Sequence, residues 1–102
     1  ITYKVGSIES SAFSGNKNIT SVTVGKNVAK LGANVFKGCK NLKRLTIKTT
    51  KLTAKKIGKS AFDGMGSTNY SKVAVKVPAK KVKSYKALFQ KAGLSSKVKV
   101  KK

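Results

Sequence analysis

The sequence predicts an α/β solenoid: a short right-handed coil of stacked repeats, with a parallel sheet along one side and a capping helix at its C-terminal end. Three observations lead to this prediction. A block built around Phe and Gly recurs along the chain, the aliphatic residues keep their offsets from copy to copy, and a proline after the last copy begins a stretch of helical periodicity. One coil cannot bury its own apolar face, so neighbouring coils supply each other's core.

The repeat is clearest in residues 35–47, which residues 12–24 match at their Phe, Gly, Asn and aliphatic positions. The phenylalanines of the three copies are 23 and 26 residues apart: Phe13, Phe36 and Phe62. An aliphatic residue precedes each of them by five positions: Ile8, Leu31 and Ile57. A period of about 20 to 29 residues with aliphatics in L-x-x-L-x-L form is typical of leucine-rich repeats, in which each coil contributes one short strand.

The predicted repeat domain spans residues 1–78, with a partial coil at 1–7 and full coils at 8–30, 31–56 and 57–78. Ile1 precedes Ile8 by seven residues, as Val24 precedes Leu31, so we expect Ile1 to end the strand of an earlier coil and the array to continue upstream. Parallel strands are expected at residues 22–24, 45–47 and 73–75. The third coil is expected to point these residues inward: Phe62, Tyr70, Val73, Val75 and Val77.

The bends and connections have their own signals. Gly15 and Gly38 follow the phenylalanines, where a positive φ or a close backbone approach is expected. Asn18 and Asn41 are equivalent positions from which a side chain can bond backbone groups of the neighbouring coil. Residues 49–56 lengthen one connection, which predicts a bulging loop there.

Pro78 ends the array, and a C-terminal cap is predicted at 79–102, with a helix at about 79–92 and a short strand at about 97–101. Apolar residues recur there at helical spacing: Val82, Tyr85, Leu88, Phe89 and Ala92. A proline is tolerated in a first helical turn, and Gly93 fits a helix C-terminus. Lysines around the final strand would discourage edge-to-edge aggregation.

The charge is strongly one-sided. Among 102 residues, Lys and Arg number 24 against two acids, giving a net charge of +22. Such a chain attracts polyanions, although salt screens exposed charges beyond about 8 Å. The periodic apolar residues nevertheless predict a folded single domain. No apolar run approaches the roughly 20 residues needed to cross a bilayer.

Catalysis is not expected, because the chain has no His and only Glu9 and Asp63 as acids. Cys39 is the single cysteine, its repeat position points inward, and it lacks a base that would make it a nucleophile. We therefore predict a buried structural Cys39, no enzyme activity, no cofactor and no metal site.

The segments Ile57-Gly58-Lys59-Ser60-Ala61-Phe62 and Leu31-Gly32 through Cys39, with Asn41-Leu42, resemble the BspA-like (Treponema pallidum type) leucine-rich repeats. The ending from Val77-Pro78 to Gly93-Leu94 looks like the lysine-rich cap of such proteins from Firmicutes. The resemblance implies a secreted or surface-attached bacterial protein in which the repeats mediate adhesion or other protein contacts.

A candidate binding strip lies at the outward strand positions, which alternation places on the concave face of the sheet. The residues predicted to form this concave basic strip are Arg44, Thr46, Lys48, Lys72 and Lys76. The expected partner is a protein or an anionic polymer such as teichoic acid, mucin glycan or a heparin-like chain, bound by a fragment that is monomeric.

Several alternatives stay open from the sequence. The lysines can be merely solvated, and the chain can be a structural spacer or cap for upstream domains. A nucleic-acid-binding module is a further alternative, although the aromatic residues that would stack on bases are predicted core positions. Attachment of the cap helix to an anionic membrane would require the apolar face that the last coil needs.

Overall fold

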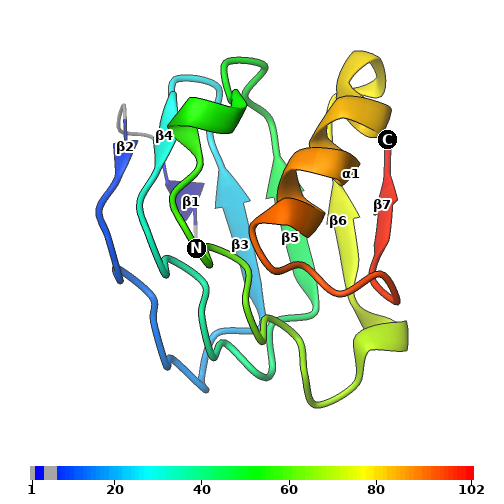
Figure 1. Ribbon diagram of the computed structural model, residues 1–102. Helices are drawn as coiled ribbons and strands as arrows, with labels where there is room; N and C mark the ends of the chain where they lie inside the picture. Colours follow the sequence, from blue (N-terminus) through cyan, green and yellow to red (C-terminus); the bar gives the residue numbers. More distant parts are fainter. Residues whose placement is uncertain (1, 4–6) are drawn as a thin grey trace.

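The computed structural model of the chain describes residues 2, 3 and 7–102 and contains two parallel sheets and one α-helix (Figure 1). The strands are β1 (Thr2–Tyr3), β2 (Ser7–Ile8), β3 (Ser21–Val24), β4 (Lys30–Leu31), β5 (Arg44–Ile47), β6 (Ala74–Lys76) and β7 (Lys99–Lys101). The helices are the 3-10 turns η1 (Ala54–Lys56), η2 (Tyr70–Lys72) and η3 (Ala79–Lys81), and α1 (Val82–Lys91).

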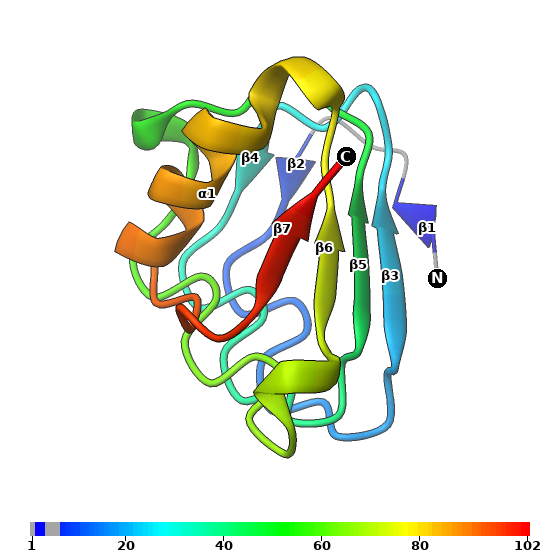
Figure 2. The same cartoon turned by 90° about the vertical axis from the view of Figure 1, so that its right-hand side faces the viewer.

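The larger sheet has the order β1-β3-β5-β6-β7, and each neighbouring pair is parallel. Figure 2 shows the strands running in one direction, with α1 on the inner side of the sheet. The register aligns one buried or half-buried aliphatic residue from each of four strands: Val22, Leu45, Val75 and Val100. The predicted parallel sheet is confirmed. The sheet is open, and the right-handed sense of the coil stays a prediction.

The second sheet lies on the opposite side of the core, where the chain turns within each coil (Figure 1). It pairs β2 with β4 in parallel, and an isolated bridge from Leu31 to Ile57 continues it to the third coil. We call this region the turn side.

Aromatic rings form a column through the core. Phe13 stacks on Phe36 with ring centroids 5.8 Å apart, and Phe36 stacks on Phe62 at 5.6 Å. The column continues into the cap. The ring centroids of Phe62 and Phe89 are 4.5 Å apart, and those of Phe89 and Tyr85 are 5.3 Å apart. Each pair of rings adds an aromatic–aromatic interaction to the stabilisation that burial of the rings provides. The predicted stacking of the three repeat phenylalanines is confirmed.

The bends follow the sequence signals. Gly15 and Gly38 have φ values of 71° and 73°, and Gly64 of the third coil repeats them at 73°. Asn41 donates from Nδ2 to the Lys17 carbonyl at 2.9 Å, which joins the second coil to the first as predicted for this position.

The predicted register of the third coil is wrong by two residues. The prediction equated Val73 with Leu45, whereas Leu45 pairs with Val75 and Arg44 with Ala74. The strand is β6 at 74–76, and the extra residues before it form η2. Three alternating valines, Val73, Val75 and Val77, fit either register on an apolar face. The pairing selects the register that aligns Val75 with Val100 of the cap as well.

The predicted role of Ile1 lies outside the described residues. Within the described part, Tyr3 lies opposite Val24, the position that the prediction had given to Ile1. At the other end, η3 and α1 occupy the stretch expected to be helical, and β7 adds a strand beside β6. The division of the chain into a repeat domain and a cap at residue 78 stays a prediction, because both share one core.

The long connection after β5 folds back onto α1. Thr49 and Leu52 are buried, and η1 follows them. The Tyr85 hydroxyl donates to the Thr49 carbonyl at 2.9 Å and accepts from the Leu52 N–H at 3.3 Å. The loop that the sequence predicts as a bulge is therefore fixed to the cap helix by a buried side chain.

Candidate anion-binding face

The candidate site lies on the outer face of the five-stranded sheet, the face opposite the core. Along β3 and β5 the side chains alternate between exposed or half-buried and buried, as expected for a sheet with one solvated face. The register then aligns the outward residues of neighbouring strands in two rows. One row contains Ser21, Arg44, Ala74 and Lys99, and the other contains Thr23, Thr46, Lys76 and Lys101.

Charge is unevenly distributed along these rows. The first-coil side carries the hydroxyls of Ser21 and Thr23, whereas the cap side carries cations. We call Arg44, Lys76, Lys99 and Lys101 the basic strip; all four side chains are exposed. Neighbouring strands are about 4.8 Å apart, so Lys76 and Lys101 are held as close in-register cations. The two acids of the chain lie elsewhere, Glu9 just after β2 and Asp63 in the third bend.

Two hollows lie along the basic strip. One has a volume of about 380 Å³ and is lined by Arg44, Leu45, Thr46, Ala74, Lys76 and Lys101. The other has a volume of about 450 Å³ and is lined by Lys26, Thr46, Ile47, Lys48, Lys76, Val77, Pro78 and Lys102. Because both include Thr46 and Lys76, the hollows adjoin and follow β5 and β6 toward the end of the sheet. The lining contains cations, hydroxyls and aliphatic groups but no acidic side chain.

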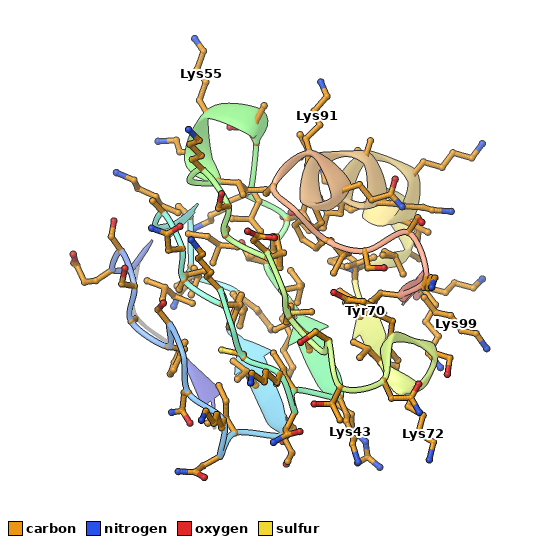
Figure 3. All side chains as sticks on the ribbon, turned by 60° about the horizontal axis from the view of Figure 1, so that its bottom comes forward. Lys43, Lys55, Tyr70, Lys72, Lys91 and Lys99 are labelled. Carbon is orange, nitrogen blue, oxygen red and sulfur yellow. The ribbon has the colours of Figure 1, made fainter. Side chains whose placement is uncertain are left out.

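The structure brings together most of the predicted strip. Arg44, Thr46 and Lys76 share one hollow, and Lys48, just beyond the end of β5, lines the next. Lys72 does not join them, because it belongs to η2 and precedes the strand. Figure 3 shows Lys72 extending into solvent from the same end of the molecule as Lys43. The error follows directly from the two-residue shift in the third coil.

The sequence does not indicate Lys99 and Lys101 as members of the basic strip. It predicts them only as lysines that protect a sheet edge. Their signal was the alternation of lysines with Val98 and Val100, which is that of a strand with one buried face. Their pairing partners, Ala74 and Lys76, depend on a contact between the cap and the third coil that no local pattern specifies.

Cys39 is buried, as predicted. Its Sγ donates to the Phe13 carbonyl at 2.9 Å. Burial raises the pKa of the Cys39 thiol, and the backbone of Asn16 lowers it by a smaller amount. The thiol is therefore held in its neutral, weakly nucleophilic form.

The residues that the structure describes, 2, 3 and 7–102, contain no group of three or more His, Cys, Asp or Glu side chains placed to hold a metal ion. They also contain no helix with the length and apolar character needed to cross a membrane.

Comparison with known proteins adds one finding. The family model described as "BspA type Leucine rich repeat region (6 copies)" matches residues 1–100. No curated protein and no solved structure gives a significant match to the chain.

Proposed function

Because the chain belongs to the BspA-type leucine-rich-repeat family, we propose that it is a non-catalytic adhesion module of a secreted or surface-attached bacterial protein. Repeats of this family suggest a protein-interaction module, and leucine-rich repeats are generally non-catalytic. The proposal goes further and assigns an anionic surface polymer, such as a sulfated or carboxylated glycan or a teichoic-acid-like chain, to the outer face of the sheet.

The basic strip is the observation that carries this proposal. Its four cations come from three adjacent strands, so the backbone register fixes where each side chain begins. A polymer with repeated anionic groups can contact several of them at once, and each contact releases counterions. The hollows beside the strip provide hydroxyl and aliphatic contacts at Thr46, Val77 and Pro78, which suit a sugar or polyol backbone.

Nucleic acid is supported less well by the same face. Single-stranded nucleic acid binds through aromatic side chains on which bases stack. Here the described phenylalanines and Tyr85 belong to the core column or pack against it, and Tyr70 lies half-buried in η2. Phosphate attraction without base contacts would remain, and it is one outcome of the test below.

The test compares two pairs of charge reversals. Lys76→Glu with Lys101→Glu changes the basic strip, whereas Lys83→Glu with Lys86→Glu makes the same change in net charge on exposed positions of α1. Binding to heparin fragments, purified teichoic acid and single-stranded DNA would be measured by titration calorimetry at about 50 and 200 mM salt.

We expect the strip pair to weaken glycan or teichoic-acid binding at least tenfold more than the helix pair. With six or more charges engaged, affinity of the unaltered protein should fall about a thousandfold or more between the two salt concentrations. Equal losses from both pairs would show diffuse attraction, as expected of a spacer with solvated lysines. Preference for DNA with loss from the strip pair would assign the face to nucleic acid.

A further inference from the structure

A ladder of backbone hydrogen bonds on the turn side joins each coil to the next. At each step a glycine N–H donates to a carbonyl of the coil before it. Gly32 donates to Ile8 and Gly58 donates to Leu31, both at 2.8 Å. These bonds continue the pairing of β2, β4 and Ile57.

The earlier coil donates back from a position three residues after each acceptor. Ser11 N–H donates to the Ala33 carbonyl at 2.8 Å, and Asn34 N–H donates to the Lys59 carbonyl at 3.0 Å. Ser11 and Asn34 have positive φ values of 60° and 59°. Each coil is thus held by an acceptor and a donor that engage two consecutive residues of the next coil.

The third coil presents the same two groups, the Ile57 carbonyl and the Ser60 N–H. Ser60 has a φ of 58°, so its backbone has the same conformation as that of the donors Ser11 and Asn34 in the earlier coils. None of the backbone hydrogen bonds among the described residues outside regular helices and strands uses either group. The cap takes the place of a fourth coil only further along, where Phe62 N–H donates to the Ala92 carbonyl at 3.0 Å.

A groove of about 440 Å³ lies beside these two groups. Its lining residues are Ala54, Ile57, Gly58, Lys59, Ser60, Asp63, Leu88, Lys91, Ala92 and Gly93. Ile57 and Leu88 are partly buried and give it apolar walls. Figure 3 shows Lys55 of η1 and Lys91 of α1 extending into solvent on this side of the molecule. We call it the edge groove.

We infer that the edge groove binds an extended, acidic, glycine-containing peptide segment of a partner protein, which pairs with residues 57–60 as a fourth coil would. Addition of a strand to a free edge is a general mode of peptide recognition. One peptide residue would donate its N–H to the Ile57 carbonyl, and the next would accept from the Ser60 N–H.

Glycine is required at the first of these two residues by the close approach of the backbones. A Cβ built at Gly32 would overlap the backbone nitrogen of Ser10, and one built at Gly58 would overlap that of Ala33. A peptide that pairs with Ile57 and Ser60 at the same spacing would have no room for a side chain at this residue. Acidic neighbours are favoured by Lys59 and Lys91 at the groove, while Asp63 lies at the end next to Gly93.

This inference does not depend on the outer face, because the edge groove shares no lining residue with the two hollows there. It therefore adds a second interaction surface to the module, with a different chemistry. The outer face offers charge, whereas the edge groove offers directed backbone hydrogen bonds and a steric filter.

The probe is a blocked pentapeptide, Glu-Ile-Gly-Glu-Ser, which copies residues 56–60 with acidic residues in place of the two lysines. Its control has alanine in place of the glycine. Both would be titrated into the ¹⁵N-labelled protein, following the amide signals and the hydrogen exchange of Ser60. We expect the glycine peptide to shift the Ser60 amide and slow its exchange, and the alanine peptide to bind at least about tenfold more weakly.

A matched pair of variants tests the charge contribution. Lys91→Glu should weaken the glycine peptide severalfold, whereas Lys83→Glu, on an exposed position of the same helix, should leave binding within twofold. Equal binding of the two peptides, or shifts confined to Lys76 and Lys101, would overturn the inference. The second outcome would leave the proposal for the outer face intact.

Discussion

The first-coil side and the cap side of the molecule differ in both packing and surface charge. On the first-coil side, the ring of Phe13 is half-buried and stacks on Phe36. On the cap side, Phe62 is fully buried between Phe36 and Phe89. The outward residues of β3 are Ser21 and Thr23, whereas β6 and β7 present lysines.

The two differences are connected through the cap. The cap supplies Phe89 and Tyr85 to the core and β7 to the sheet, so the same segment that extends the aromatic column also supplies the strand that carries Lys99 and Lys101. On α1, by contrast, the exposed lysines Lys83, Lys86 and Lys91 belong to a single helix outside the register of the sheet. A high net charge alone attracts anions to the whole surface of a molecule. The register of a packed sheet places some of those charges at defined positions on one surface.

The largest effect is expected from the middle of the aromatic column. Phe36→Ala should lower the free energy of unfolding by about 3 to 5 kcal/mol, because it leaves a cavity between two rings that cannot collapse onto it. Urea unfolding followed by circular dichroism would measure the loss. A loss below about 1 kcal/mol would show that Phe36 does not hold the two sides together.

The matched change on the first-coil side is Phe13→Ala. Since that ring is already partly solvated, less transfer free energy is lost and the cavity opens to water, so the cost should be about half that of Phe36→Ala. Equal costs for the two variants would mean that the sides are packed alike.

A smaller effect is expected where the cap holds the long loop. Tyr85→Phe keeps the ring but removes the hydroxyl that bonds Thr49 and Leu52, leaving a buried carbonyl and N–H without their partner. We expect a loss of about 1 to 3 kcal/mol. Amide hydrogen exchange at Leu52 should rise more than at Val22, which lies in β3 on the other side. An unchanged Leu52 amide would show that Tyr85 does not fix the loop.

The smallest effect concerns Cys39, which links the first and second coils through its bond to the Phe13 carbonyl. Its pKa is raised by burial, so the folded thiol keeps its proton when the unfolded one begins to lose it near about pH 8.5. The unfolded state then binds fewer protons, and the free energy of unfolding falls as the pH rises above that value. Below that pH, Cys39 adds no pH dependence to the free energy of unfolding.

Urea midpoints at about pH 7.5 and 9.5 would measure how the free energy of unfolding changes with pH in the unaltered protein and in Cys39→Ser. The serine can retain a donor to Phe13 but does not ionise in this range. We expect the free energy of unfolding to fall less with pH in the variant. Identical slopes would contradict a buried, neutral Cys39.

The repeated parts of this fold could be predicted from the sequence, because each coil places the same kinds of residue at the same buried positions. The phenylalanine column, the bends at Gly15 and Gly38 and the bond from Asn41 to the first coil all follow from matched offsets. The third coil could not be placed so well. Its valines alternate over five residues, and the choice between two registers depends on β7, which is distant in sequence.

The wrong register of the third coil also led to a wrong residue in the candidate site. Arg44 and Thr46 lie in a regular coil and were placed correctly, whereas Lys72 was assigned to the strand by the wrong register. Lys99 and Lys101 entered the strip only through pairing with β6. The edge groove was missed as well, because it depends on where the cap begins to replace a coil, at Phe62 and not at Ile57.

A map of the contact surface on the labelled protein tests most directly whether the basic strip is a binding site. A sulfated heparin hexasaccharide would be titrated into the ¹⁵N-labelled chain at about 150 mM salt, and the amide shifts would be compared across the molecule. If the basic strip is a binding site, the largest shifts should fall on Arg44, Thr46, Lys76 and Lys101, with small shifts at Ser21 and Thr23 and at Lys83 and Lys86 of α1. Shifts spread equally over the sheet face and α1 would contradict it, since they would show that the lysines attract anions without forming a site.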